Sequence, residues 1–172
     1  KTMSLCEGPG GFIEALDYLR NNKNDKYYGF TLISDDTNIP GWRKSQKFIS
    51  DHSNVIIETG ATKTGDILKV DNYKYFIKKY SNSFDIITGD GGFDFSIDFN
   101  KQEQISSKLI MAQLIYGITL QKYNGTFILK IFDVTNLPKI SLFSLKGYSK
   151  YFINSLFLTT SIANPFESNL YS

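Results

Sequence analysis

Short apolar segments alternate with amphipathic segments along the chain, a pattern typical of an α/β sheet protein. Apolar runs rich in β-branched and aromatic residues predict strands at residues 2–6, 26–33, 54–58, 84–88, 126–132 and 153–159. Apolar residues three or four positions apart predict helices at residues 12–21, 71–80, 102–123 and 138–148. We therefore predict a mostly parallel sheet of about seven strands, with helices on both faces and an antiparallel last strand.

Three local features sharpen this prediction. In the first predicted helix, Phe12, Leu16 and Leu19 fall on one face and should pack on the sheet. Asn124-Gly125 follows the longest helix and should end it. The polar stretch at 34–53 is typical of a long loop with room for one short helix.

Composition narrows the class of protein. A chain of 172 residues, 41% of them hydrophobic, is long enough for one folded domain, which we expect to span residues 1–172. Cys6 is the only cysteine, so this sequence can form neither an intrachain disulfide nor a cysteine-built metal site, and a reducing intracellular compartment is expected. His52 is the only histidine, which disfavours a Ser-His-Asp hydrolase and a histidine metal site. No apolar run approaches the roughly 20 residues that cross a bilayer, so no membrane partner is expected.

The ends and the charge of the chain add two expectations. The sequence opens at Lys1 almost directly in a predicted strand, so we expect a segment of a longer protein, truncated at both ends. The net charge of +2 neither requires nor excludes a polyanionic partner. Basic residues in the first third form either a solvated face or a rim that contacts phosphates: Arg20, Lys23, Lys26, Arg43, Lys44 and Lys47.

A glycine-rich turn joins the first predicted strand to the first helix and reads Cys6-Glu7-Gly8-Pro9-Gly10-Gly11-Phe12. Such a turn lets backbone amides approach a ligand closely at the carboxyl edge of the sheet. It lacks the spacing of a dinucleotide site and of a phosphate loop, which disfavours a pyrophosphate ligand. The turn predicts either a cofactor with an adenosine and a zwitterionic tail or a turn with no ligand.

Four further residues are candidates for chemistry. Asp66, in Gly65-Asp66-Ile67, could accept a hydrogen bond from an adenine amino group or cap the following helix. Asp90 ends a strand between two glycines, where a substrate could come near, although a turn-forming Asp is the alternative. Lys130 lies in an apolar strand, where it should pair with Asp90 or reach solvent at a sheet edge. Taken by itself, Glu167 is an ordinary surface residue.

In their order along the chain, these segments resemble the FtsJ-like RNA 2′-O-methyltransferases, most closely the cap-specific (nucleoside-2′-O) branch of eukaryotes and large DNA viruses. The segments that carry the resemblance are Leu5-Cys6-Glu7-Gly8-Pro9-Gly10-Gly11-Phe12, Thr64-Gly65-Asp66-Ile67, Asp90-Gly91-Gly92-Phe93, Asn100-Lys101-Gln102-Glu103, Leu129-Lys130-Ile131-Phe132-Asp133, and Thr160-Ser161 followed by Glu167. The resemblance covers nearly the whole chain. It implies a Rossmann-like methyltransferase fold with S-adenosyl-L-methionine as cofactor and no metal.

The resemblance also implies a role for each matched residue. The residues that would bind the cofactor are Cys6, Glu7, Gly8, Pro9, Gly10, Gly11, Phe12, Asp66, Ile67 and Asp90. Asp90, Lys130 and Glu167 would be the last three members of the family's catalytic Lys-Asp-Lys-Glu tetrad. Asn100 would contact the RNA substrate.

The sequence departs from the family pattern at three places. The first lysine of the tetrad normally lies tens of residues before the glycine-rich turn, and Lys1 is too close to the turn for that role. Glu7 stands where the cap-specific branch usually has Ala. In the final segment the usual Ser-Arg pair reads Ser161-Ile162, and the usual Asn-Ser reads Pro165-Phe166, which weakens the match around Glu167.

The implied function is methylation of a ribose 2′-hydroxyl in RNA at the cap-proximal nucleotide of mRNA. Capped mRNA and a protein of the capping machinery are the implied partners, in the host cytoplasm for a viral protein and otherwise in the nucleus or cytoplasm. Two alternatives stay open. One is a non-catalytic module of the same fold that binds RNA or a partner, because the first lysine is absent. The other is methylation of ribosomal or transfer RNA.

Overall fold

The computed structural model describes residues 1–36, 39–92, 99–131 and 156–160, with the backbone alone described for residues 99–106, 131 and 156–160. The strands are β1 (Thr2–Leu5), β2 (Tyr27–Phe30), β3 (Val55–Glu58), β4 (Phe84–Gly89), β5 (Gln121–Ile131) and β6 (Leu156–Thr160). The helices are α1 (Gly11–Arg20), the 3₁₀ helix η1 (Trp42–Ser45), α2 (Gln46–Asp51), α3 (Val70–Tyr80) and α4 (Phe99–Leu120).

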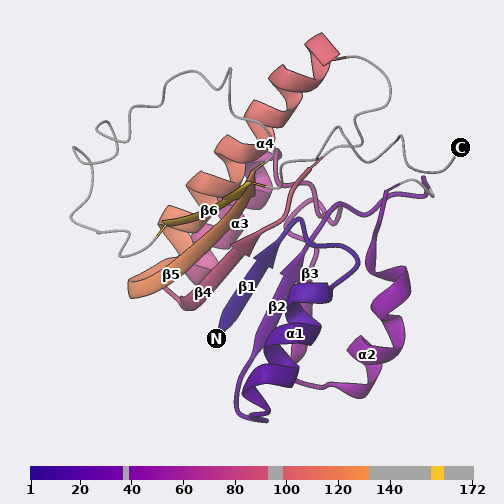
Figure 1. Ribbon diagram of the computed structural model, residues 1–172, viewed down its shortest axis with the longest axis vertical. Helices are drawn as coiled ribbons and strands as arrows, with labels where there is room; N and C mark the ends of the chain where they lie inside the picture. The colour runs from indigo at the N-terminus through magenta and orange to yellow at the C-terminus, as the bar shows by residue number, and fades with distance from the viewer. Residues whose placement is uncertain (37–38, 93–98, 132–155, 161–172) are drawn as a thin grey trace, which may run out of the picture.

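The strands form one sheet of six in the order β3-β2-β1-β4-β5-β6, and every neighbouring pair is parallel (Figure 1). The chain therefore runs outward from β1 to β3, returns to the other side of β1 with β4, and continues outward to β6. This arrangement confirms the predicted α/β fold with a parallel sheet. A seventh, antiparallel strand does not occur among the described residues, and the helix predicted at 138–148 lies outside them.

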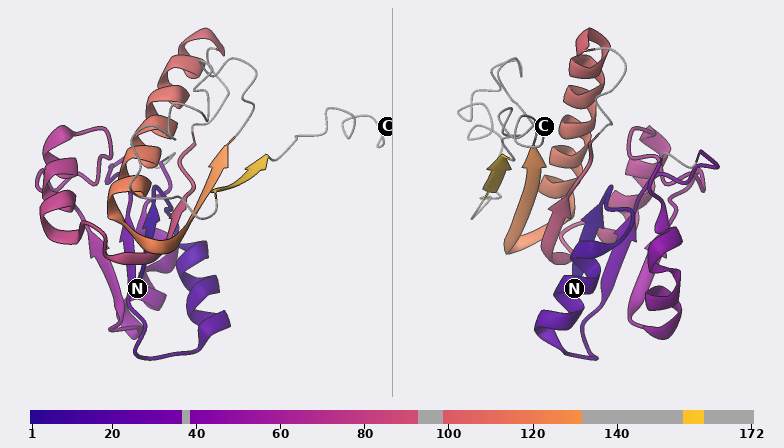
Figure 2. Two further views of the ribbon diagram at one scale, coloured as in Figure 1. Left: turned by 90° about the vertical axis from the view of Figure 1, so that its left-hand side faces the viewer. Right: turned by 45° about the vertical axis from the view of Figure 1, so that its right-hand side comes forward.

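Helices cover both faces of the sheet (Figure 2). α3 and α4 lie over the larger core, in which Phe30 of the central sheet contacts Phe76 with ring centroids 4.5 Å apart. α1, η1 and α2 cover the other face around the smaller core of Ile13, Tyr27 and Val55. Burial of the sheet on both sides explains why its strands read as continuous apolar runs.

The buried face of α1 differs from the prediction. Ile13 is the fully buried residue, with 1% of its surface exposed, whereas Leu19 is 76% exposed and Phe12 is 38% exposed. Leu16 packs at the edge of the smaller core, as expected. Apolar residues occupy two overlapping stripes of this helix, and the turn that precedes it decides which stripe faces the sheet. The periodicity alone could not make that choice.

The boundary between α4 and β5 also differs. α4 ends at Leu120 and β5 begins at the next residue, so Asn124-Gly125 does not end the helix. Instead, the pairing of β4 with β5 is interrupted between Phe84 and Ile86, which pair with Gln121 and Thr126. Asn124 adopts a left-handed backbone with φ 63°, and Asn tolerates that conformation better than most residues. Asn124 and Gly125 thus form an irregularity inside the strand.

Within the described ranges, no helix combines the length and the apolarity needed to cross a bilayer.

Candidate active site

The candidate site lies where the direction of the chain reverses in the sheet. β2 follows on one side of β1 and β4 lies on the other, so the carboxyl ends of β1 and β4 mark the switch point of the sheet (Figure 1). At this edge the Asp90 N–H donates to the Leu5 carbonyl at 3.1 Å, and the Cys6 N–H donates to the Phe30 carbonyl at 2.6 Å. Ligands of open α/β sheets bind at such a point.

Asp90 and Lys130 meet at this edge as an ion pair between Asp90 Oδ1 and Lys130 Nζ. The register places Leu129 opposite Gly89, so the residues that follow each of them are brought side by side. Both side chains are partly buried, with 27% of Asp90 and 34% of Lys130 exposed. The predicted pairing of Asp90 with Lys130 is therefore present, with the amine held at the open edge of the sheet.

The glycine-rich turn is closed by its own backbone and by the neighbouring 3₁₀ helix. The Gly10 N–H donates to the Glu7 carbonyl at 2.8 Å, and Gly10 has a φ of 112° that favours glycine. A side chain at Gly8 would overlap the Pro40 carbonyl, and the Ser45 hydroxyl donates to the Pro9 carbonyl. A side chain at Gly11 would meet nothing within 4 Å, so the backbone there borders open space.

Glu7 lies inside this turn, with only 2% of its surface exposed. Its Oε1 accepts hydrogen bonds from the backbone N–H groups of Phe12 and Ile13, the latter at 3.2 Å. Burial raises the pKa of Glu7 to about 7, against the lowering effect of the Ser4 hydroxyl and the two N–H groups. A carboxyl of the chain itself therefore fills the amino end of α1, which agrees with the expectation that no pyrophosphate binds there.

The segment after β3 brings Asp66 to the same edge. Gly65 has a φ of 65°, and a side chain on it would overlap the Thr31 carbonyl at the end of β2. Asp66 Oδ1 accepts the Leu68 N–H at 2.9 Å, which makes a local turn. α3 starts only at Val70 and has no side-chain cap, so Asp66 does not serve as its N-cap.

The Cys6 thiol shows how close the acidic residues lie. Burial, together with the negative charges of Asp66 and Asp90, raises the pKa of Cys6 to about 12. Both carboxylates therefore lie near Cys6. A thiol with such a pKa stays protonated and is a poor nucleophile.

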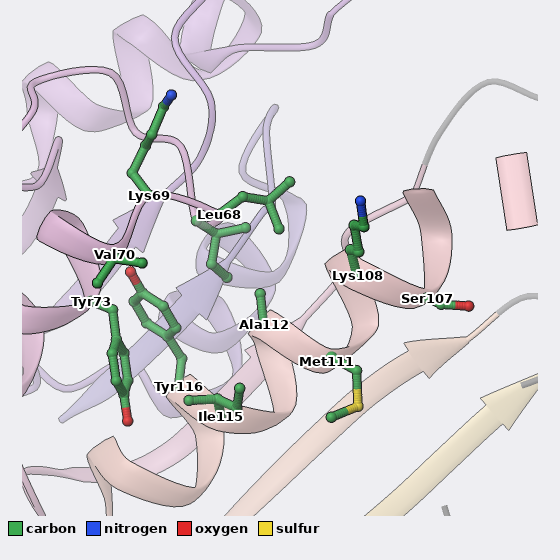
Figure 3. A pocket seen from close by; sticks show the side chains of 11 residues that line it. Leu68, Lys69, Val70, Tyr73, Ser107, Lys108, Met111, Ala112, Ile115 and Tyr116 are labelled. Carbon is green, nitrogen blue, oxygen red and sulfur yellow. The ribbon is translucent and has the colours of Figure 1, made fainter. Parts of the chain in front are cut away.

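A hollow of about 370 Å³ lies beside the Asp66 segment, between that segment and α4 (Figure 3). Ile67 and Leu68 contribute to one wall, and Met111 and Ile115 of α4 contribute to the other. Its lining is mainly apolar, with Tyr116 reaching into it from α4. The segment predicted to contact adenosine thus borders an apolar hollow rather than a charged one.

Sequence reasoning missed Gln113, which is fully buried in α4. Its Oε1 accepts the Gly91 N–H at 2.9 Å and its Nε2 donates to the Leu109 carbonyl at 3.2 Å. It therefore fixes the turn that directly follows Asp90. The sequence does contain a signal for this residue. Gln113 interrupts the apolar stripe of α4 between Leu109 and Tyr116, and an amide buried at such a position needs hydrogen-bond partners.

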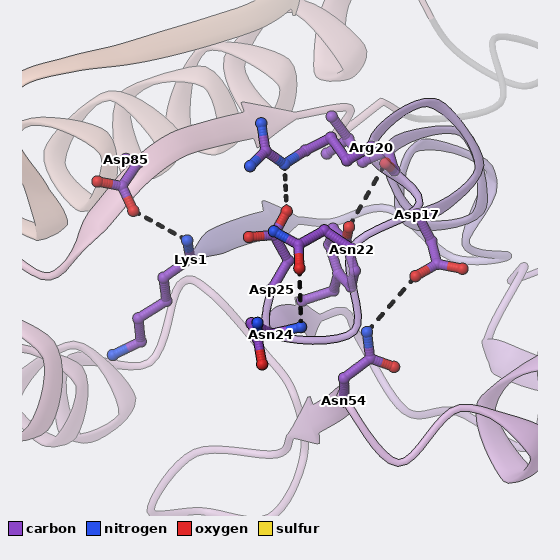
Figure 4. Close-up of polar contacts among 10 residues, drawn as sticks. Lys1, Asp17, Arg20, Asn22, Asn24, Asp25, Asn54 and Asp85 are labelled. Atoms are coloured by element: carbon purple, nitrogen blue, oxygen red, sulfur yellow. Dashed lines mark hydrogen bonds and ion pairs between the residues drawn. The ribbon is translucent and has the colours of Figure 1, made fainter.

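The six basic residues divide between the two edges of the sheet. Arg43, Lys44 and Lys47 belong to the η1–α2 region, which contacts the glycine-rich turn through Ser45. Arg20 pairs with Asp25 near the amino ends of the strands, the region drawn in Figure 4. Lys23 and Lys26 lie in the same connection between α1 and β2. The first group is therefore the one beside the glycine-rich turn.

The amino edge also holds Lys1, whose ammonium Nζ lies 4.8 Å from the ring centroids of Tyr80 and Phe84. Lys1 precedes β1, and its terminal amine pairs with Asp85 (Figure 4). It therefore lies at the opposite edge from Asp90, which follows β4. This position agrees with the expectation that Lys1 is not the first lysine of the tetrad.

The His52 ring stacks on the Phe48 ring, which is a structural contact.

Two predicted site residues are described in part or not at all. Asn100 lies in the first turn of α4, where only the backbone is described. Glu167 lies outside the described residues, and its role stays a prediction. In the part of the chain that the structure covers, no three His, Cys, Asp or Glu side chains gather closely enough to hold a metal ion.

Comparison with known proteins gives one consistent match. The model of the FtsJ-like methyltransferase family matches residues 1–155. Cap-specific mRNA (nucleoside-2′-O-)-methyltransferase 1A of Caenorhabditis briggsae is 33% identical over 137 residues, which cover 76% of this chain and 15% of that protein. An inactive cap-specific mRNA (nucleoside-2′-O-)-methyltransferase 1B of the same species is 31% identical over 137 residues, covering 76% and 16%. The human cap-specific mRNA (nucleoside-2′-O-)-methyltransferase 1 is 30% identical over 139 residues, also covering 76% and 16%.

The chain thus spans about a sixth of the length of these relatives. The matched region includes the glycine-rich turn, the Asp66 segment and the Asp90–Lys130 pair at the carboxyl edge of a parallel sheet. The chain therefore belongs to the FtsJ-like methyltransferase family.

Proposed function

We propose that this chain forms the catalytic core of an enzyme that methylates a ribose 2′-hydroxyl in RNA, at the cap-proximal nucleotide of mRNA. The observation that carries the proposal is the Asp90–Lys130 ion pair at the ligand-binding edge of the sheet. The relatives whose names include this reaction support the choice of a capped RNA as substrate.

The residues at this edge fit S-adenosyl-L-methionine, which supplies an electrophilic methyl group on a sulfonium when bound. Two carboxylates, Asp66 and Asp90, face the region around Cys6 and favour a ligand with positive charge and amino donors. Open space at Gly11 leaves room beside the turn. Because Glu7 already occupies the amino end of α1, a diphosphate ligand is a poor alternative.

In its neutral form, Lys130 would receive the proton of the ribose hydroxyl at Nζ, and a second nearby cation such as the first lysine of the tetrad would favour that neutral form. A ribose hydroxyl is a weak acid, so its attack on a methyl group requires a base within hydrogen-bond reach. Asp90 would hold Nζ at the edge of the sheet through the ion pair, which orients the amine toward the substrate. Holding reacting groups in line lowers the barrier by itself, since the cost of orientation is met on binding.

The test is methyl transfer from labelled S-adenosyl-L-methionine to capped and uncapped short RNAs, with the full-length protein. Lys130→Met should lower kcat by about 10²- to 10⁴-fold, the usual contribution of a general base. Lys122→Met is the matched control, because Lys122 pairs with Asp85 at 2.8 Å on the same two strands but near their amino ends. It should leave kcat unchanged.

Each outcome decides between the candidate functions. Transfer to capped RNA alone, lost in Lys130→Met, supports cap ribose methylation, and equal transfer to both RNAs points to ribosomal or transfer RNA instead. A wild-type protein that binds cofactor or RNA but transfers no methyl group points to a non-catalytic module. One observation favours this second candidate, since a relative at 31% identity is described as inactive.

A further inference from the structure

Glu7 links two parts of the glycine-rich turn that are separate in the backbone. Its carbonyl accepts the Gly10 N–H at 2.8 Å and closes the turn from residue 7 to residue 10. Its side chain reaches past that turn to accept the N–H groups of Phe12 and Ile13. One residue therefore fixes both the turn and the start of α1.

The amino end of α1 needs such a contact. The first N–H groups of any helix have no partner within the helix, and a side chain at the N-cap position usually supplies one. Here the N-cap is Gly10, which has no side chain and makes no capping bond. Glu7 supplies the missing acceptor from inside the protein, where 2% of its surface is exposed and solvent could not replace it.

Two further contacts hold residues 8 and 9 of the turn. The Gly8 N–H donates to Thr31 Oγ1 at 3.3 Å, and the Ser45 hydroxyl donates to the Pro9 carbonyl. None of these contacts reaches the backbone between Gly11 and Ile13. Among the contacts of the turn, the one that ties this backbone to the rest of the turn is therefore the Glu7 side chain.

We infer that Glu7 is a positioning residue for the cofactor-binding turn: its carboxyl caps α1 from within and holds residues 7–12 in the shape that receives the cofactor. This inference rests on the proposed function. A turn that is ordered before binding spends less of the binding free energy on its own ordering. Loss of the Glu7 carboxyl should therefore weaken cofactor binding and leave RNA binding unchanged.

The experiment compares Glu7→Ala with Glu7→Gln in the full-length protein. Glu7→Ala removes the acceptor and should raise the Kd for S-adenosylhomocysteine, measured by calorimetry, about tenfold. Glu7→Gln keeps an oxygen at the same reach and should stay within about threefold of wild type. The matched control is Glu14→Gln, which removes a carboxylate from the first turn of α1 that is not bonded to the helix N–H groups.

Kinetics separate positioning from general stability. Glu7→Ala should raise the KM for S-adenosyl-L-methionine and leave the KM for RNA unchanged, whereas a merely less stable protein would lose activity without this split. Hydrogen exchange at the Phe12 and Ile13 amides should become faster in Glu7→Ala and stay slow in Glu7→Gln. If Glu7→Ala does not fold, Glu7→Asp replaces it, since its shorter side chain withdraws the carboxyl from both N–H groups.

Three results overturn the inference. A folded Glu7→Ala or Glu7→Asp protein with the wild-type Kd overturns it alone, as does an equal loss of binding in Glu14→Gln. A wild-type protein that binds no S-adenosylhomocysteine overturns the proposed function and this inference with it. The two failures are therefore distinguished by the wild-type titration.

Discussion

Gln113 should be required for the position of Asp90 as well as for stability. In Gln113→Leu the volume of the side chain is kept, but the buried Gly91 N–H loses the acceptor that lies 2.9 Å away. An unsatisfied buried N–H costs about 1–3 kcal/mol, so the free energy of unfolding should fall by that amount. Because the freed turn carries Asp90, kcat should fall about ten- to a hundredfold, as expected when a catalytic group shifts by about 1 Å.

Gln121→Leu is the matched comparison. Gln121 is also a buried glutamine, and its Nε2 donates to the Gly125 carbonyl near the amino end of the sheet. Its loss should lower the free energy of unfolding, measured in urea, by about 1–3 kcal/mol. It should leave methyl transfer unchanged at temperatures where the protein is folded. Full activity in Gln113→Leu, or an equal loss of kcat in Gln121→Leu, would refute the role assigned to Gln113.

Three further predictions follow from single positions. Burial raises the pKa of Glu7 from 4.5 to about 7, so the folded state binds this proton more tightly and stability is lost as the pH rises through 7. Relative to Glu7→Gln, the free energy of unfolding of the wild type, measured in urea, should fall by up to about 3 kcal/mol between pH 4 and pH 8. In Gly65→Ala the new methyl group would overlap the Thr31 carbonyl, and alanine would have to adopt a left-handed backbone, so the free energy of unfolding should fall by about 3 kcal/mol or more. In the control Gly41→Ala the methyl group meets nothing within 4 Å, so the free energy of unfolding should change little. Phe30→Ala leaves a cavity in the larger core, where Phe30 is fully buried, and should lower the free energy of unfolding, measured in urea, by about 3–5 kcal/mol.

Most of the elements followed from sequence because strands buried on both faces and helices buried on one have distinct periods. The strand at 84–88 was predicted within one residue of β4, and the helix at 71–80 within one residue of α3. The prediction failed where two local signals competed. At Asn124-Gly125 the usual helix stop is part of an irregular strand, since pairing with β4 outweighs the local preference.

The candidate site, like the fold, was predicted from the sequence only in part. The order of the glycine-rich turn, the Asp66 segment, Asp90 and Lys130 along the chain was sufficient to predict a site at the carboxyl edge. Gln113 was not predicted, because its partner Gly91 lies 22 residues away and only packing of α4 on the sheet brings them together.

By itself, the sequence determined the fold class, the family and the residues that carry charge at the site, because these depend on residue type and order. Only the tertiary structure decided that the Glu7 side chain turns inward and caps α1. It also decided that the register of β4 and β5 sets Lys130 beside Asp90, and that three of the six basic residues lie near the amino ends of the strands. These outcomes depend on register and on the rotation of a helix about its axis, which a shift of one residue can reverse. Contacts between distant segments fix them, and no local pattern encodes such contacts.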